Sequence, residues 1–413
     1  MSATLSMSDV LPTRVRPFEK TQKPTPPWLR LLLGRALAPT RAEFDRAGQA
    51  LREGDPEADA LVAWMFSQSP RQARAQFEQA LQHGIDSVTD APQPLRDFFA
   101  VVDREPDWLD RELLDDGIRF IHRTGAVAPV VLRDLALMAG YLLSGFNHAL
   151  VMTGALNQGT SRRIAETGKW WMDCTEFGGL ERFGDGFKST LHVRLVHALV
   201  RRSLAGREDW DHARWGTPLN QIDMVATYLG FCVVLLGGVR KMGIPVTPRE
   251  SRGVMHLWRY ACWIMGVQEQ WLVDSERDGI ILLSHALTTQ SPPDHTSREL
   301  GRALSLEPLE RQYPFLQDLR RKLAYHQHLS VTRYFIGARK MPLLGLPDDI
   351  LPWYPLLTLG PRLLGYSAQR LLPAARRRQE ARGRRMQREL LGAVFGDRAH
   401  QVIQPGADHP AHI

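Results

Sequence analysis

Cysteine is scarce in this sequence, with three residues, Cys174, Cys232 and Cys262, among 413. They lie far apart and form no Cys-x-x-Cys pair, which excludes a disulfide framework and a zinc site built from cysteine alone. We expect three reduced thiols, as in a cytoplasmic protein. The first 27 residues are polar and rich in proline, and they show neither a secretory signal nor a twin-arginine pattern.

Acidic residues are outnumbered, 45 against 52 basic ones, for a formal charge of +7. Most of the excess lies in one segment, because seven arginines between Arg376 and Arg388 are offset by few glutamates. The remainder is close to neutral, so we expect no nucleic-acid partner. We expect Arg376–Arg388 to form an exposed basic helix, which either contacts an anionic membrane or is simply solvated.

Strand signals and long hydrophobic runs are also missing. The longest apolar runs, Leu135–Gly145 and Met224–Gly238, fall short of the roughly 20 residues that cross a bilayer, and we interpret them as buried helices. No run alternates as a strand does, and no Asn-Gly hairpin turn is present. The Gly-x-Gly-x-x-Gly fingerprint, the P-loop and the Gly-x-Ser-x-Gly elbow are absent as well. The sequence therefore predicts an all-α protein without these nucleotide or hydrolase sites.

Helical periodicity begins near Arg41, where Thr40 and Glu43 have the spacing of a capping box. We divide the chain into a partly disordered N-terminal extension (1–40), a helical core (41–290), a C-terminal helical part packed on that core (291–395) and a disordered tail (396–413). Six prolines between 342 and 373 predict short, broken helices in the C-terminal part.

The helix expected over 187–202 carries three polar residues, Arg194, His197 and Arg201, on one stripe of an otherwise apolar sequence. We expect them to be buried together or to face a cavity, and buried guanidinium groups need anions. A porphyrin offers two propionates, and its iron accepts a neutral imidazole. On spacing alone, an ordinary core histidine is the commoner case, with the arginines paired to Asp or Glu elsewhere.

A second polar group, Arg163, Glu166 and Thr167, shares one face of the preceding helix. An arginine beside a hydroxyl suits a polar pocket that holds bound dioxygen. A solvated helix face would show the same spacing.

Together these residues carry a resemblance. Arg163-x-x-Glu166-Thr167, followed thirty residues after Thr167 by His197 in its Arg194-x-x-His197-Ala198-x-x-Arg201 setting, resembles the latex-clearing (rubber oxygenase) family and the wider MpaB-type oxygenase superfamily. The similarity extends roughly over 114–267, with a weaker stretch at 333–355.

The resemblance implies a globin-like helical core that encloses haem b, with additional N- and C-terminal helices. It makes His197 the iron ligand and Arg194 and Arg201 cofactor-binding residues, and it places Arg163, Thr167 and Glu166 on the catalytic, distal side. The implied function is a haem b-dependent oxygenase that uses O₂ to oxidise or cleave a hydrophobic, isoprenoid-like substrate. The alternatives are a haem protein with another redox role, and a non-catalytic helical protein that binds a membrane surface or a partner.

Two departures from the family pattern bear on the substrate. Latex-clearing members have a lysine, a possible sixth iron ligand, where this chain has Glu166. They also have a glutamate, proposed as a base, where this chain has Asn147-His148, and His148 is a candidate replacement. We therefore expect a small substrate rather than polymeric rubber, and an open distal side of the iron.

Overall fold

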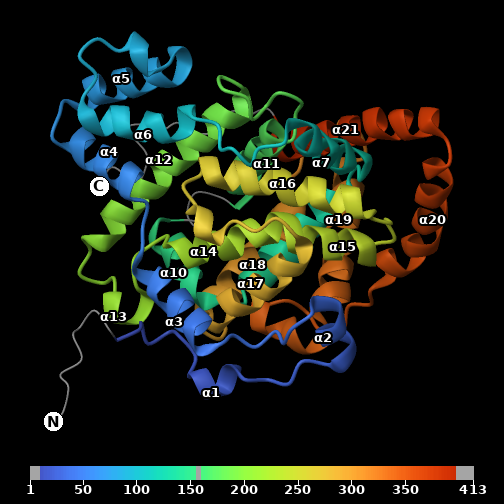
Figure 1. Cartoon of the computed structure of the whole chain (residues 1–413). Helices are drawn as coiled ribbons and strands as arrows, with labels where there is room; N and C mark the ends of the chain where they lie inside the picture. The colour runs from blue at the N-terminus through green and yellow to red at the C-terminus, as the bar shows by residue number, and fades with distance from the viewer. Residues whose placement is uncertain (1–9, 155–159, 397–413) are drawn as a thin grey trace.

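A computed structural model describes residues 10–154 and 160–396, and every regular element in those ranges is helical (Figure 1). The all-α prediction is confirmed. The first quarter of the chain contains α1 (Phe18–Thr21), α2 (Pro27–Leu33), α3 (Arg41–Gln49), η1 (Ala50–Arg52), α4 (Pro56–Phe66), α5 (Pro70–His83), η2 (Ile85–Ser87) and α6 (Gln93–Asp103).

The middle of the chain builds the core. Its elements are α7 (Arg111–Arg123), α8 (Val127–Val131), η3 (Leu132–Leu137), α9 (Met138–Gly140), α10 (Ser144–Met152), α11 (Thr160–Cys174), α12 (Asp185–Ala205), α13 (His212–Trp215), α14 (Gln221–Leu229), η4 (Gly230–Val234), α15 (Leu235–Lys241) and α16 (Pro248–Ile264). The remaining elements are η5 (Glu269–Trp271), α17 (Glu276–Thr288), α18 (His295–Leu306), η6 (Glu307–Leu309), α19 (Gln317–Ile336), η7 (Ala338–Lys340), η8 (Pro342–Leu344), α20 (Trp353–Arg370) and α21 (Pro373–Phe395).

Local signals explain where several helices begin. Thr40 accepts a hydrogen bond from the backbone of Glu43, whose carboxylate accepts one from the backbone of Thr40 at 2.8 Å, so the predicted capping box is confirmed. Thr247 and Glu250 form a second capping box at the start of α16. Pro70 occupies the first turn of α5, where a missing N–H costs nothing.

The structure bears on both ends of the chain, and it corrects the expectation for the C-terminal part. Residues 10–40 are attached to the core, because the buried Arg14 donates hydrogen bonds to Asp223 and to the carbonyls of Thr289 and Gly145; residues 1–9 and the tail from 397 lie outside the described residues. The C-terminal part is not broken into short helices, since α19, α20 and α21 have 20, 18 and 23 residues. Most of its prolines stand at helix starts or in loops, and Pro361 alone lies inside a helix.

The core is built around α12, which packs against α4, α11 and α16. Helix α16 also lies close along α7, where a Cβ on Gly117 would come within 2.3 Å of the carbonyl oxygen of Gly253. Only glycine allows that approach, so the pair fixes where the two helices cross.

Two π-helical segments, η3 and η4, lie against each other in this core. A Cβ on Gly230 in η4 would meet the Cβ of Ala136 in η3 at 3.7 Å, an ordinary packing distance. Segments of π-helix occur often at functional sites.

The continuous stretch Gln221–Lys241, which joins α14, η4 and α15, has 21 residues and a mean hydropathy of 1.9. It is therefore long and apolar enough to cross a membrane, contrary to the length expected from the sequence. However, 67% of its apolar window is buried inside the fold, as expected for a core helix. Val127–Gly140 and Ser144–Met152 pass the same test only as a pair, and that pair bends by 99°.

Candidate functional site

The site is centred on His197 in α12. In the middle of this buried helix, Val193, Val196 and His197 keep part of their surface accessible. The ring nitrogen Nδ1 of His197 is buried and has no hydrogen-bond partner among the described residues. Burial, with a smaller contribution from Arg201, lowers the pKa of His197 to about 4. At neutral pH the residue is a neutral imidazole, which is the form that binds metals.

A tight glycine turn sets α11 beside α12. A Cβ on Gly179 would lie 2.1 Å from the carbonyl oxygen of Asp173, and the backbone N–H of Phe187 donates to the carbonyl of Gly179 at 2.8 Å. The two helices then run antiparallel, held by a 2.9 Å hydrogen bond from Trp170 Nε1 to Thr190 Oγ1. Arg163 and His197 each lie seven residues, about two helical turns, beyond that bond on neighbouring helices.

The predicted distal residues on α11 have different surroundings. Arg163 is partly exposed and makes a hydrogen bond to the hydroxyl group of the buried Tyr141. Glu166 accepts a hydrogen bond from Arg162 Nε at 3.1 Å. Burial raises the pKa of Glu166, and Arg162 opposes that rise. Thr167 is exposed.

The arginines on α12 both have carboxylate partners in α4. Arg194 binds Asp55 through two hydrogen bonds of 2.6 and 2.8 Å, and both side chains are 2% exposed. Arg201 binds Asp59 at 2.7 Å and leaves Nη2 without a partner among the described residues. Their charges are therefore balanced by protein carboxylates, the alternative that the sequence left open. A role in holding propionates stays a prediction for both arginines.

The candidate base His148 turns away toward the surface of α18. Its Nε2 lies 3.1 Å from a carboxylate oxygen of Asp294, its ring stacks on Trp215 at 4.2 Å, and burial lowers its pKa. The neighbouring Asn147 is fully buried and donates to the carbonyl of Tyr141 at 2.9 Å. Asn147, rather than His148, is thus linked to the Tyr141–Arg163 pair.

Aromatic side chains close one end of the site. Phe231, on the π-segment η4, lies 5.3 Å from Trp170 and stacks on Trp258 at 4.8 Å between ring centroids. Trp170 is the residue that bonds to Thr190, two turns along α12 from His197. Phe231 and Val193 are both partly exposed apolar residues, and Val193 lies about one turn before His197 on α12.

Three residues that bind the predicted site residues, Asp55, Asp59 and Tyr141, were not predicted from the sequence. Asp55 and Asp59 stand four residues apart on α4 and so share a face, which matches the stripe of Arg194 and Arg201. No local sequence pattern predicts that Arg194 binds Asp55, because the two residues are 139 positions apart. No sequence pattern marks Tyr141 as a partner of Arg163, because Tyr141 lies inside a run of apolar residues.

Residues 122–377, more than half of the chain, match the family described as "ER-bound oxygenase mpaB/B'/Rubber oxygenase, catalytic domain". The chain belongs to this mpaB/rubber oxygenase family. A curated relative, the "Rubber oxygenase" of Streptomyces sp. (strain K30), is 23% identical over 198 residues, which are 47% of each protein. The chain thus matches about half the length of that relative.

A solved structure, "Structure of Latex Clearing Protein LCP in the closed state", superposes with a TM-score of 0.65 and 19% identity. The match covers 82% of this chain and 91% of that one. At this identity the likeness shows a shared fold. The resemblance inferred from Arg163, Glu166, Thr167 and His197 is confirmed at the level of the family.

Proposed function

We propose that this member of the mpaB/rubber oxygenase family is a haem b-dependent oxygenase, with His197 as the iron ligand. One observation carries the proposal: His197 is a neutral, buried imidazole whose Nδ1 has no protein partner among the described residues. Buried polar atoms nearly always have a partner, and twelve other buried side-chain atoms of the described residues, Nε2 of His285 among them, lack one as well. At His197, which matches the ligand histidine of the family, a bound prosthetic group would supply the explanation.

The surrounding residues fit a haem. His197 would hold the iron, and Val193, Val196 and Phe231 supply the apolar, partly exposed contacts that a porphyrin ring needs. When bound, haem supplies the iron centre that binds and activates O₂. The fit is weaker at the propionates, because Asp55 and Asp59 already balance Arg194 and Arg201.

The protein residues have separate tasks in this proposal. The low pKa of His197 keeps the imidazole unprotonated at neutral pH. Arg163, held by the Tyr141 hydroxyl, offers N–H donors on the neighbouring helix, and Thr167 carries a hydroxyl at an exposed position of the same helix. Polar donors near a bound ligand would stabilise developing negative charge.

We further propose a hydrophobic, unsaturated, isoprenoid-like small molecule as the substrate. The family description and the name of the curated relative point to the oxygenation of isoprenoids. Glu166 and Asn147 differ from the pattern of latex-clearing members, which favours a substrate other than the polymer. Comparing oxygen uptake and carbonyl products for a short isoprenoid olefin and its saturated analogue tests the substrate class, because cleavage needs the double bond.

The decisive experiment compares two alanine variants on the same helix. His192 also lies on α12 but binds Glu78 at 2.9 Å, so it is a matched control. We expect the wild type and His192→Ala to purify with haem, and His197→Ala to lose it or to bind it at least about 100-fold more weakly. A full wild-type Soret band and iron content in His197→Ala would show that another residue holds the cofactor.

A further inference from the structure

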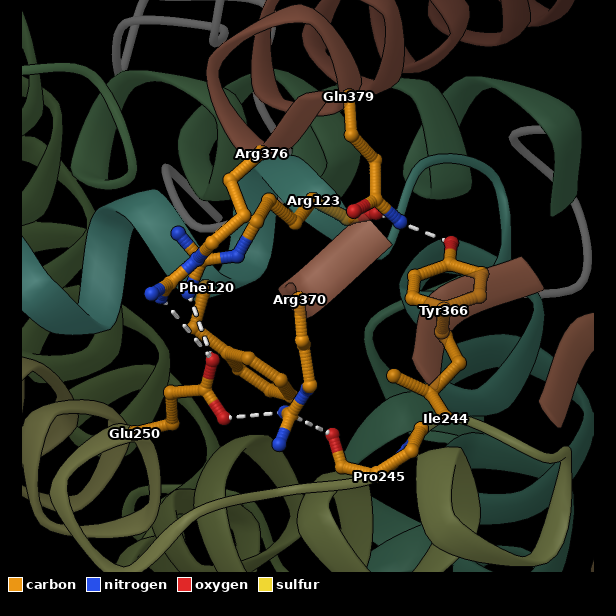
Figure 2. A pocket seen from close by; sticks show the side chains of 9 residues that line it. All are labelled: Phe120, Arg123, Ile244, Pro245, Glu250, Tyr366, Arg370, Arg376 and Gln379. Atoms are coloured by element: carbon orange, nitrogen blue, oxygen red, sulfur yellow. Dashed lines mark hydrogen bonds and ion pairs between the residues drawn. The ribbon is translucent and has the colours of Figure 1, made fainter. Parts of the chain in front are cut away.

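Helix α20 turns its charged residues toward the protein and its leucines toward solvent, the opposite of an ordinary surface helix. Its two charged residues, Arg362 and Arg370, both point toward the body of the protein. Arg362 donates to the carbonyl of Met242 at 3.5 Å, and Arg370 donates to the carboxylate of Glu250 at 2.6 Å. Tyr366 donates to the backbone of α7 at 3.0 Å. Figure 2 shows Arg370, Glu250 and Tyr366 around one small pocket at the base of this helix.

The outer face of α20 is apolar over its whole length. We define the α20 face by the most exposed leucines of this helix and of the two residues that follow it, Leu356 (63% exposed), Leu357 (70%), Leu364 (73%), Leu371 (81%) and Leu372 (62%). Between them the exposed positions are small or uncharged. In Figure 1 the helix forms the outer edge of the molecule, on the right. A surface helix normally turns its polar side to water, and a continuous exposed apolar face marks an interaction site.

Arginines border one end of this face. The following helix, α21, exposes Arg377, Arg378, Arg382 and Arg385. The basic segment is only partly free, however, because Arg384 is buried against Glu176 at 2.5 Å, which corrects the expectation of a wholly exposed helix. Leucines bordered by exposed arginines match the boundary between the acyl chains and the phosphates of an anionic bilayer.

We propose that the α20 face docks flat on an anionic lipid bilayer, with its leucines below the headgroups and the α21 arginines at the phosphates. A second copy of this chain is a poorer occupant, because a symmetric contact through this face would bring the same arginines together, and α20 has no acidic residue to meet them. The proposal does not depend on the haem site. It would place the protein at the phase in which a hydrophobic substrate dissolves.

The first test is sedimentation of the full-length protein with vesicles. We expect binding to phosphatidylcholine vesicles that contain phosphatidylserine, weaker binding to phosphatidylcholine alone, and a partial loss of binding in high salt. Salt should act only in part, because screening over roughly 8 Å weakens the arginine contacts but not leucine insertion. Absence of binding to the phosphatidylserine vesicles in low salt would overturn the proposal.

Paired variants then locate the contact. Leu364→Ser/Leu371→Ser removes two leucines from the α20 face, and Leu319→Ser/Leu323→Ser removes two others that are 63% and 55% exposed on α19. We expect the first pair to weaken vesicle binding by roughly tenfold or more and the second to change it little. An equal loss in both pairs would mean that binding is unspecific. Haem content should stay at the wild-type level in both double variants, which separates this test from the test of the proposed function.

A site-specific probe gives the orientation. The three native cysteines are buried, so a polarity-sensitive dye on Leu364→Cys reports mainly that position. We expect its emission to shift to the blue on addition of anionic vesicles, with no shift for a dye on Leu323→Cys. A blue shift without vesicles, together with a dimer in sedimentation velocity, would show instead that the face joins two copies of the chain.

Discussion

Two buried histidines, His197 on α12 and His328 on α19, differ in what their ring nitrogens meet. Burial lowers the pKa of both to about 4, with help from Arg201 and Arg133 respectively, so both are neutral at pH 7. Nδ1 of His328 lies 2.5 Å from a carboxylate oxygen of Asp134, whereas Nδ1 of His197 has no partner among the described residues. The fold pairs one of these rings with a carboxylate and leaves Nδ1 of the other without a partner among the described residues.

The surroundings of His328 explain why it is structural. Arg133 lies 2.5 Å from Asp134 and 3.0 Å from Glu307, and Arg311 binds Glu307 at 2.8 Å. The two arginines balance the two carboxylates, and the network ties the π-segment η3 to η6 and α19. Burial raises the pKa of Glu307, but Arg311 and Arg133 outweigh it and hold that pKa at about 2. No vacancy in this network calls for a further group.

The largest effect on stability should come from breaking that network. Asp134→Ala leaves Arg133 with one buried partner fewer and His328 with none, so we expect the free energy of unfolding to fall by about 3–5 kcal/mol. Urea denaturation followed by circular dichroism measures it. Asp134→Asn keeps the shape and part of the hydrogen bonding and should lose less. Equal stability of Asp134→Ala and the wild type would show that the network contributes nothing.

Alanine variants of His328 and His197 test whether the paired ring contributes more to stability than the unpaired one. His328→Ala removes the partner of a buried carboxylate and leaves a cavity, so it should cost about 2–3 kcal/mol. His197→Ala removes an unpaired, partly accessible ring, so in the haem-free protein it should cost about 1 kcal/mol or less. The same denaturation experiment on both haem-free variants gives the difference. A larger loss for His197→Ala would reverse the assignment of the two rings.

Lowering the pH should reduce the stability of the fold through the buried ring of His328. The pKa of His328 is about 4 in the folded protein and about 6.5 when unfolded, so the unfolded chain takes up the proton first. Its contribution to stability is complete above pH 6.5, falls between pH 6.5 and 4, and is constant below pH 4. By pH 5 about 2 kcal/mol should be lost through this residue. Denaturation midpoints of the wild type and His328→Gln between pH 7 and 4 check it, and the variant should show the shallower decline.

Local patterns predicted more of the molecule than of the site. The capping box at Thr40, the buried helix around His197 and the stripe of Arg194, His197 and Arg201 all follow from residues within one or two turns of each other. The partners of those arginines do not, because Asp55 and Asp59 come from α4 by long-range folding. Periodicity describes a helix face, and only packing decides what covers it.

Helix α20 shows that local sequence patterns also fail to predict which helix face stays exposed. Its prolines predicted short pieces, yet Pro355 lies in the first turn, and Pro361 is accommodated inside an 18-residue helix at an exposed position. The outward leucines are visible in the sequence, but nothing local in the sequence predicts that they are exposed. Their exposure follows from Arg370 and Tyr366, which hold the opposite face to the body.

The smallest effect is expected at Glu166, where α11 differs from the latex-clearing pattern. Glu166→Lys replaces a favourable pair with the half-exposed Arg162 by a repulsive one, which should cost about 0.5 kcal/mol. The informative measurement on Glu166→Lys is the absorption spectrum of the haem-loaded protein. Because a carboxylate is a poor match for a sixth ligand, we expect the wild-type resting iron to be open and to bind azide or imidazole without a slow step. A lysine at this position should shift the spectrum toward low spin if the residue faces the iron, while Glu166→Gln, which removes the charge without adding a ligand, should not. A wild-type spectrum that is purely low-spin and unresponsive to azide would mean that another side chain caps the iron and that Glu166 belongs to the solvated surface of α11.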